Sequence, residues 1–151
     1  MHSELERAKE LLTTKGYTCV ILKGDIYYNS TKRGIAPLMG YLADGIHMQG
    51  YFAADKVVGK AAAYLYVLLE IAELYVGVIS VPALEVLQRF HIPVTYDTLV
   101  PAIRNRTDTG FCPMESAVLE IHDVEEAYHI LKAKLEAMTE KDSLIKEKSH
   151  A

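Results

Sequence analysis

The chain has 151 residues, of which 50% are hydrophobic and 24% are charged. That composition suffices for one domain with one hydrophobic core. The formal net charge of −4 argues against nucleic acid as the main partner, because binding a phosphate backbone requires a basic surface.

Cysteine content and hydropathy both favour a cytoplasmic protein. Cys19 and Cys112 are the two cysteines, too few for a secreted disulfide framework. The N-terminal sequence is charged and amphipathic and lacks the apolar core of a signal peptide. The longest apolar run, around residues 61–69, is too short to span a bilayer, so we expect no membrane partner.

The N-terminal part of the chain predicts a helix, a hairpin and a second helix. Ser3 and Glu6 form a capping-box pattern that begins the first helix, and Gly16 ends it. The runs that follow are β-branched, apolar or aromatic and are joined by a tight turn. The expected elements are a helix from Ser3 to about Lys15, strands over 18–22 and 26–29, and a short helix over 34–44.

The rest of the chain alternates strands and helices. From Asp55 onward, apolar residues recur at helical spacing, whereas residues 74–79 form a short apolar run typical of a central strand. The expected elements are a strand over 48–54, a helix from Asp55 to about Ala72, a strand over 74–79, a helix over 82–90, a strand over 93–96, a polar loop over 101–110, a helix that opens at Cys112, and a final helix after Asp123 with a frayed charged tail from about residue 139.

This order predicts the α/β class. Strands that alternate with helices form parallel pairs through right-handed crossovers, and the hairpin adds antiparallel strands. We therefore expect a three-layer α/β/α architecture with a mixed sheet. No linker or repeat divides the chain, so residues 1–151 are expected to form a single domain.

Two segments carry a resemblance to a known family. ADKVVGKAAAYL (residues 54–65) and TGFCPMESAVL (residues 109–119) resemble signatures of a bacterial domain-of-unknown-function family assigned to the cytidine-deaminase-like superfamily. The resemblance covers nearly the whole chain. It implies a cytidine-deaminase-like fold.

The zinc chemistry of that superfamily is not supported by the residues. Zinc deaminases open one helix with His or Cys, a spacer and Glu, and the next helix with Pro-Cys-x-x-Cys. The matching stretches here are Asp55-Lys56-Val57 and Ser80 to Glu85, which contain neither the cysteines nor the glutamate in register. No histidine pair has chelating spacing either, so we expect no metal, no cofactor and no zinc-dependent deamination.

Three predicted helix starts should meet at one edge of the sheet, namely those near Asp55, Ser80 and Cys112. Helix N-termini favour anions through free N–H groups and the helix dipole. Asp55 is either a plain helix cap or a ligand contact. Lys56 and Lys60 share one helix face, as a solvent edge or as an anion clamp. Gly59 within the predicted helix indicates close packing by a neighbouring element or a ligand.

The third start adds a cysteine and a polar loop. Cys112 precedes Pro113, so it should be the N-cap of a helix with Glu115 three residues on. A thiol there is either reactive or simply packed. The preceding loop carries polar and cationic residues that suit phosphate or carboxylate. They are Arg104, Arg106 and Thr109.

Two main functions remain open from the sequence, and a third is weaker. The first is binding of a small anionic or nucleotide-like molecule by Asp55, Lys56, Lys60, Arg104, Arg106, Thr109 and Glu115. The second is a structural role as a homo-oligomer, through the apolar stripe of the last helix and the ten tyrosines. The third is an enzyme that uses Cys112 as a catalytic nucleophile.

Overall fold

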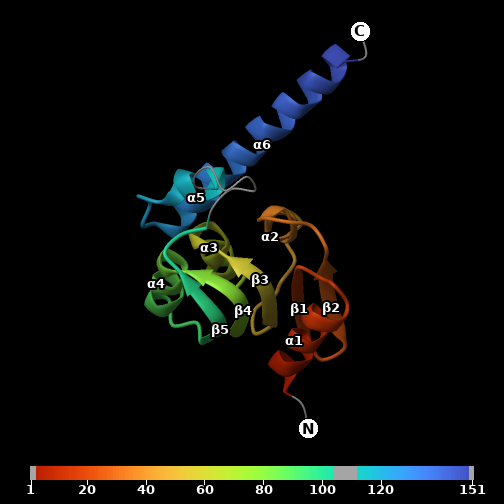
Figure 1. Cartoon of the computed structure of the whole chain (residues 1–151), viewed down its shortest axis with the longest axis vertical. Coiled ribbons are helices and arrows are strands. Elements are labelled where there is room, and N and C mark those ends of the chain that lie inside the picture. The colour runs from red at the N-terminus through yellow and green to blue at the C-terminus, as the bar shows by residue number, and fades with distance from the viewer. Residues whose placement is uncertain (1–2, 104–111, 150–151) are drawn as a thin grey trace.

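A mixed five-stranded sheet forms the centre of the molecule, as seen in a computed structural model (Figure 1). The structure describes residues 3–103 and 112–149, with side chains as far as Met138. The strands are β1 (Cys19–Lys23), β2 (Ile26–Ser30), β3 (Phe52–Val58), β4 (Glu73–Ser80) and β5 (Val94–Val100). The helices are α1 (Glu4–Thr14), α2 (Ala36–Ala43), α3 (Lys60–Leu68), α4 (Val81–Arg89), α5 (Pro113–Val118) and α6 (Val124–Ser149).

The strand order is β2-β1-β3-β4-β5. Strand β1 is antiparallel to both β2 and β3, whereas β3, β4 and β5 run parallel. The mixed sheet and the α/β class predicted from the sequence are therefore confirmed. Because β3 and β4 are parallel neighbours, their carboxyl ends, and the helices that follow them, lie at the same edge of the sheet.

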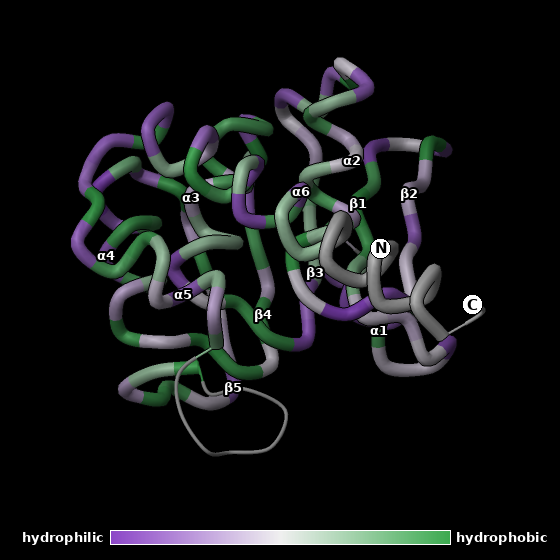
Figure 2. The backbone as a smooth tube through the Cα atoms, turned by 90° about the horizontal axis from the view of Figure 1, so that it is seen from above, coloured by the Kyte–Doolittle hydropathy of each residue, from purple (hydrophilic) through white to green (hydrophobic). Residues whose placement is uncertain are grey.

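Helices cover both faces of the sheet. On one face α1 packs on β1 and β3 around a small cluster that includes Ala8, Leu12 and Val20. The main core lies on the other face, beneath α2, α3 and α4, and α5 and α6 pack over α3. The backbone viewed from above, coloured by hydropathy, shows hydrophobic stretches in the sheet and in α3 (Figure 2).

The predicted helix starts are mostly confirmed. Ser3 caps α1 through a reciprocal capping box with Glu6. Cys112 is the N-cap of α5, with Pro113 in its first turn. At α6, the Glu126 N–H donates to the Asp123 carboxylate at 2.9 Å, as expected of an N-cap.

The predicted start of the third helix was wrong. Asp55 and Lys56 lie in β3, which continues to Val58, and α3 begins only at Lys60. The reason is pairing with β4, since Val57 and Val58 align with Val78 and Ile79 and extend the sheet. Asp55 is thus not a helix cap, and Lys56 and Lys60 do not share a helix face.

Further boundaries differ from the predictions, among them the start of β3, which lies at Phe52 and not at residue 48. Helix α3 ends at Leu68, four residues before Ala72, and Glu70 adopts a positive φ of 59° that ends the helix. Strand β5 continues to Val100 because it pairs with β4 along its length. Helix α6 continues to Ser149, past the tail predicted to fray, and extends away from the sheet (Figure 1).

Gly77 of β4 permits a close approach by the neighbouring strand. A Cβ at this position would lie 2.7 Å from the Lys56 carbonyl oxygen, a backbone atom that cannot move alone. Gly77→Ala should therefore destabilise the protein by about 1–3 kcal/mol. Urea unfolding followed by circular dichroism measures this change.

Gly40 supplies the control for that measurement. It lies inside α2, and a Cβ at this position would meet no other atom within 4 Å. Gly40→Ala should stabilise the protein by about 0.4–1 kcal/mol, because alanine favours the helix and restricts the unfolded chain. Equal effects of the two substitutions would contradict the proposed close contact at Gly77.

Candidate functional site

The candidate site lies at the sheet edge where β3 and β4 end and where α3 and α4 begin. Helix α5 joins this edge through Glu115, which contacts the first residues of α3. The predicted helix starts near Asp55 and Ser80 thus lead into two neighbouring helices, α3 and α4. The helix that follows Cys112, α5, contacts the first of them. Ligands of parallel sheets commonly bind at such an edge.

Glu115 occupies the N-terminus of α3. Its carboxylate accepts the Lys60 N–H at 2.7 Å and the Ala61 N–H at 3.1 Å. We call these two N–H groups together with Gly59 the carboxylate cradle. The first N–H groups of a helix lack partners within the helix and carry its positive dipole end, so a carboxylate there is stabilised.

Gly59 makes the cradle possible. A Cβ at this position would lie 2.0 Å from a Glu115 carboxylate oxygen, far inside contact distance. The sequence predicted close packing at Gly59, and the packing group is this carboxylate. Burial raises the pKa of Glu115, while its two N–H bonds and the nearby Lys60 ammonium act in the opposite direction.

Lys60 is a buried part of the same contact between helices. Its side chain is 6% exposed, and its ammonium donates to the Leu119 carbonyl at 2.7 Å. Burial and the nearby Arg89 guanidinium lower the pKa of Lys60. Since this cation already has a carbonyl partner in the structure, it is not the solvent edge of α3.

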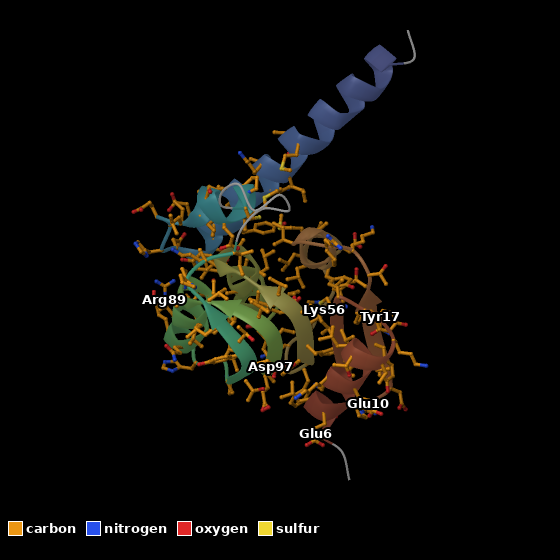
Figure 3. The ribbon with its side chains drawn as sticks, in the orientation of Figure 1. Glu6, Glu10, Tyr17, Lys56, Arg89 and Asp97 are labelled. Atoms are coloured by element: carbon orange, nitrogen blue, oxygen red, sulfur yellow. The ribbon has the colours of Figure 1, made fainter. Side chains whose placement is uncertain are left out.

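Two more donors secure the turn between α5 and α6. Tyr64 of α3 donates its hydroxyl to the Ile121 carbonyl. Arg89 of α4 donates to the His122 carbonyl at 2.9 Å and lies at the outer side of the molecule (Figure 3). Together with Glu115 and Lys60, these contacts hold the C-terminal helices over the start of α3.

Asp55 belongs to a second buried group of polar side chains. Its Oδ2 accepts the Tyr66 hydroxyl at 2.6 Å, and its Oδ1 accepts the Val57 N–H at 3.2 Å. The Cys19 sulfur lies 3.2 Å from the Tyr66 hydroxyl oxygen. Burial raises the pKa of Asp55 from 3.8 to about 7, against the opposing effect of these hydrogen bonds.

The other predicted site residues have different positions. Lys56 is exposed on β3 (Figure 3). Cys112 is partly buried and packs against the main core, and its side chain makes no capping hydrogen bond. Arg104, Arg106 and Thr109 lie outside the described residues. Of the predicted set, the structure brings Lys60 and Glu115 into contact.

Sequence reasoning missed the tyrosines that complete these contacts. Tyr64 and Tyr66 lie within the helix predicted from Asp55 to about Ala72, but their hydroxyl partners are 57 and 11 residues away in the chain. Arg89 was also missed, because nothing in its local sequence indicates a distant carbonyl partner. A signal was present for the tyrosines, since a buried hydroxyl usually requires a hydrogen-bond partner.

No metal-binding group appears in the part of the chain that the structure describes. Among those residues, no group of three His, Cys, Asp or Glu side chains could hold a metal ion. A shallow hollow of about 190 Å³ lies between α2, α3 and α6, lined by Leu42, Leu68, Glu125 and Tyr128. None of the described helices has the length and apolar character needed to cross a membrane.

Comparison with known families identifies the relatives of this chain. The family described as TM1506, a domain of unknown function (DUF1893), matches residues 7–135. The chain belongs to the DUF1893 family. The expected membership of a domain-of-unknown-function family is thereby confirmed, whereas its two signatures and its cytidine-deaminase-like fold stay predictions.

A solved DUF1893 structure has a similar fold. The crystal structure of the family protein TM1506 from Thermotoga maritima is 27% identical in sequence, with a TM-score of 0.82. The similarity covers 89% of this chain and 92% of that one. No curated protein matches the chain. The family description assigns no activity, so the function must be argued from the site.

The pKa of Asp55 makes stability depend on pH. A carboxyl group whose pKa is higher in the folded state than in the unfolded state opposes folding increasingly as the pH rises between the two values. Asp55→Asn removes this charge. Since each pH unit is worth about 1.4 kcal/mol, the variant should gain at most about 4 kcal/mol relative to wild type between pH 4 and pH 8.

Urea unfolding at several pH values measures this gain. Asp44→Asn is the control, because Asp44 is an exposed aspartate at the end of α2. A stability difference between Asp55→Asn and wild type that does not change with pH would contradict the raised pKa.

The contact between Gly59 and Glu115 predicts strong coupling between substitutions. Gly59→Ala should destabilise the protein by about 1–3 kcal/mol through the clash with Glu115. In the Glu115→Ala background the clash is absent. The double variant should therefore lose at least about 1 kcal/mol less stability than the sum of the losses of the two single variants. Gly40→Ala combined with Glu115→Ala should be additive within about 0.5 kcal/mol. Additivity of the first pair would show that the cradle does not form in solution.

Proposed function

We propose that this protein binds a small anionic or nucleotide-like molecule at the carboxylate cradle, on a cytidine-deaminase-like scaffold without zinc chemistry. The mixed sheet, with an antiparallel hairpin beside parallel strands, supports that scaffold. Residues 57–63 and 80–85 contain no histidine or cysteine, which supports the absence of zinc-dependent deamination.

One observation carries the proposal: the cradle already binds a carboxylate. Two N–H groups converge on Glu115, Gly59 leaves room for it, and the buried Lys60 ammonium adds positive charge nearby. These features suit any carboxylate- or phosphate-sized anion. In this proposal the anionic group of a ligand replaces Glu115, and α5 moves away as it does so.

Removing Glu115 should open the cradle to external anions. A charge-assisted hydrogen bond contributes about 1.5–3 kcal/mol, so loss of the competing carboxylate should tighten binding of AMP or inorganic phosphate by about 10- to 100-fold. Isothermal titration calorimetry on wild type, Glu115→Ala and Glu115→Gln measures the affinities. Glu120→Ala is the matched control, because Glu120 is an exposed carboxylate nearby in the chain.

Lys60→Met in the Glu115→Ala background should weaken AMP binding again. Circular dichroism establishes that each variant is folded before titration. If neither AMP nor phosphate binds any folded variant, the proposal is wrong. If Glu120→Ala tightens binding as much as Glu115→Ala does, the effect is one of general charge and the cradle is not the site.

Helix α6 favours a second candidate function, assembly into a homo-oligomer. At 1.5 Å per residue its 26 residues span about 39 Å, and Figure 1 shows its C-terminal part extending away from the sheet. In proteins most helical stability comes from packing of an amphipathic face, so a second copy is a reasonable partner for α6. Light scattering tests this candidate, and a monomer at all concentrations would exclude it.

The role of Cys112 as a catalytic nucleophile stays a prediction. It lies three residues before Glu115 and is partly exposed at the N-cap of α5. The alkylation rate of Cys112, measured as a function of pH, gives the pKa of its thiol. A pKa near the free value of about 8.5 would exclude a reactive thiol.

A further inference from the structure

Strand β5 is an edge of the sheet that is exposed on both faces. Within the described part of the chain it pairs with β4 alone, and it lies at the opposite side of the sheet from β2 (Figure 1). Its five central residues, 95–99, are all exposed, and none of them belongs to either core cluster. Two of them are large apolar side chains, Tyr96 and Leu99, which are 40% and 42% exposed.

Little on β5 prevents another strand from pairing with it. Proteins commonly protect a free strand edge with lysines, prolines, bulges or a short strand. Strand β5 has seven residues without lysine or proline, and it follows β4 at a constant offset without a bulge. Its one charged side chain, Asp97, accepts the Tyr75 hydroxyl of β4. The other edge strand, β2, has five residues and is followed closely by Lys32 and Arg33.

The backbone of β5 presents every second residue to this free edge. The Leu74 N–H donates to the Pro93 carbonyl at 3.0 Å, so that carbonyl points toward β4. N–H and C=O groups alternate sides along a strand, and the regular pairing with β4 continues to Val100. The odd-numbered residues of β5 therefore bond to β4, and the even-numbered ones, with Tyr96 near the middle, point outward.

A second copy of β5 fits this edge in antiparallel orientation. A two-fold axis places one residue opposite itself, and β5 pairs over at least five residues when that residue is Tyr96, Asp97 or Thr98. An axis at Asp97 brings two carboxylates together, and an axis at Thr98 places Asp97 opposite the apolar Leu99. An axis at Tyr96 instead pairs two aromatic rings and places Asp97 opposite the Thr95 hydroxyl, and such pairs stabilise a sheet.

Exposed apolar side chains also flank this edge. Phe90 and Val81, which are 38% and 39% exposed, lie at the two ends of α4, the helix that packs on β4 and β5. A second sheet joined at β5 would lie next to this helix. The match of β5 with its own sequence, together with this apolar border, favours a second copy of the chain over another partner.

We propose that β5 is a homodimer interface, in which the β5 strands of two copies pair antiparallel about a two-fold axis at Tyr96 and join their sheets into one. The outward N–H and C=O groups of the even-numbered residues then bond across the interface. This interface does not depend on anion binding at the carboxylate cradle, and it assigns assembly to a different surface from α6.

Light scattering of the full chain over a range of concentrations tests the interface. Wild type should dimerise. Tyr96→Lys should raise the dimer Kd at least about tenfold, because two lysines then face each other at the axis. Thr95→Lys should lower the Kd, because each lysine then faces Asp97 of the second copy. Tyr27→Lys is the matched control and should leave the Kd unchanged, because Tyr27 is a 41% exposed tyrosine on the other edge strand.

Disulfide formation tests the register in a Cys112→Ser background. Tyr96→Cys should oxidise to a covalent dimer, because residues paired at the axis have Cα atoms about 5.5 Å apart, within disulfide range. Thr98→Cys should not, because its partner across the interface is Val94. Circular dichroism establishes that every variant is folded.

A wild-type chain that stays monomeric at every concentration would overturn the proposal. A dimer that withstands Tyr96→Lys, or that Tyr27→Lys weakens equally, would place the contact elsewhere and overturn it too. Equal oxidation of Tyr96→Cys and Thr98→Cys would contradict the axis at Tyr96. All of these outcomes leave the anion-binding proposal standing.

Discussion

The contact on which the candidate site depends is that between one carboxylate and the first two N–H groups of α3. Glu115 accepts both, and Gly59 has no side chain to keep it out. This contact joins two segments 55 residues apart in the chain. This contact also places α5 over the sheet edge. The turn after α5 is held there by Lys60, Tyr64 and Arg89, whose side chains donate hydrogen bonds to its backbone carbonyls.

The carboxyl groups of Glu115 and Asp55 have different surroundings. Glu115 is bound by backbone donors next to an ammonium group, whereas Asp55 is bound by the Tyr66 hydroxyl and by backbone N–H groups of β3. Burial raises the pKa of both. In our account Glu115 occupies the position that the anionic group of a ligand would take.

Much of the fold was predictable from local signals. Capping side chains indicated the starts of α1 and α6, Pro113 indicated the start of α5, and Gly16 marked the end of α1. The boundary at Asp55 was not predictable, because Val57 and Val58 fit a helix or a strand and only pairing with β4 decides between them. For the site, Gly59 indicated a close approach, but local sequence could not identify Glu115 as the approaching group. The buried polar group of Cys19, Tyr66 and Asp55 is built from three elements and has no local sequence pattern.

The most direct test of the account is nitrogen-15 NMR of the Lys60 and Ala61 amides while AMP is added. The account predicts that both amide signals shift strongly on removal of Glu115, and that AMP restores them toward their wild-type positions in Glu115→Ala. Amide signals at Lys60 and Ala61 that ignore AMP, while signals elsewhere in the protein respond to it, would contradict the claim that the start of α3 is the anion site.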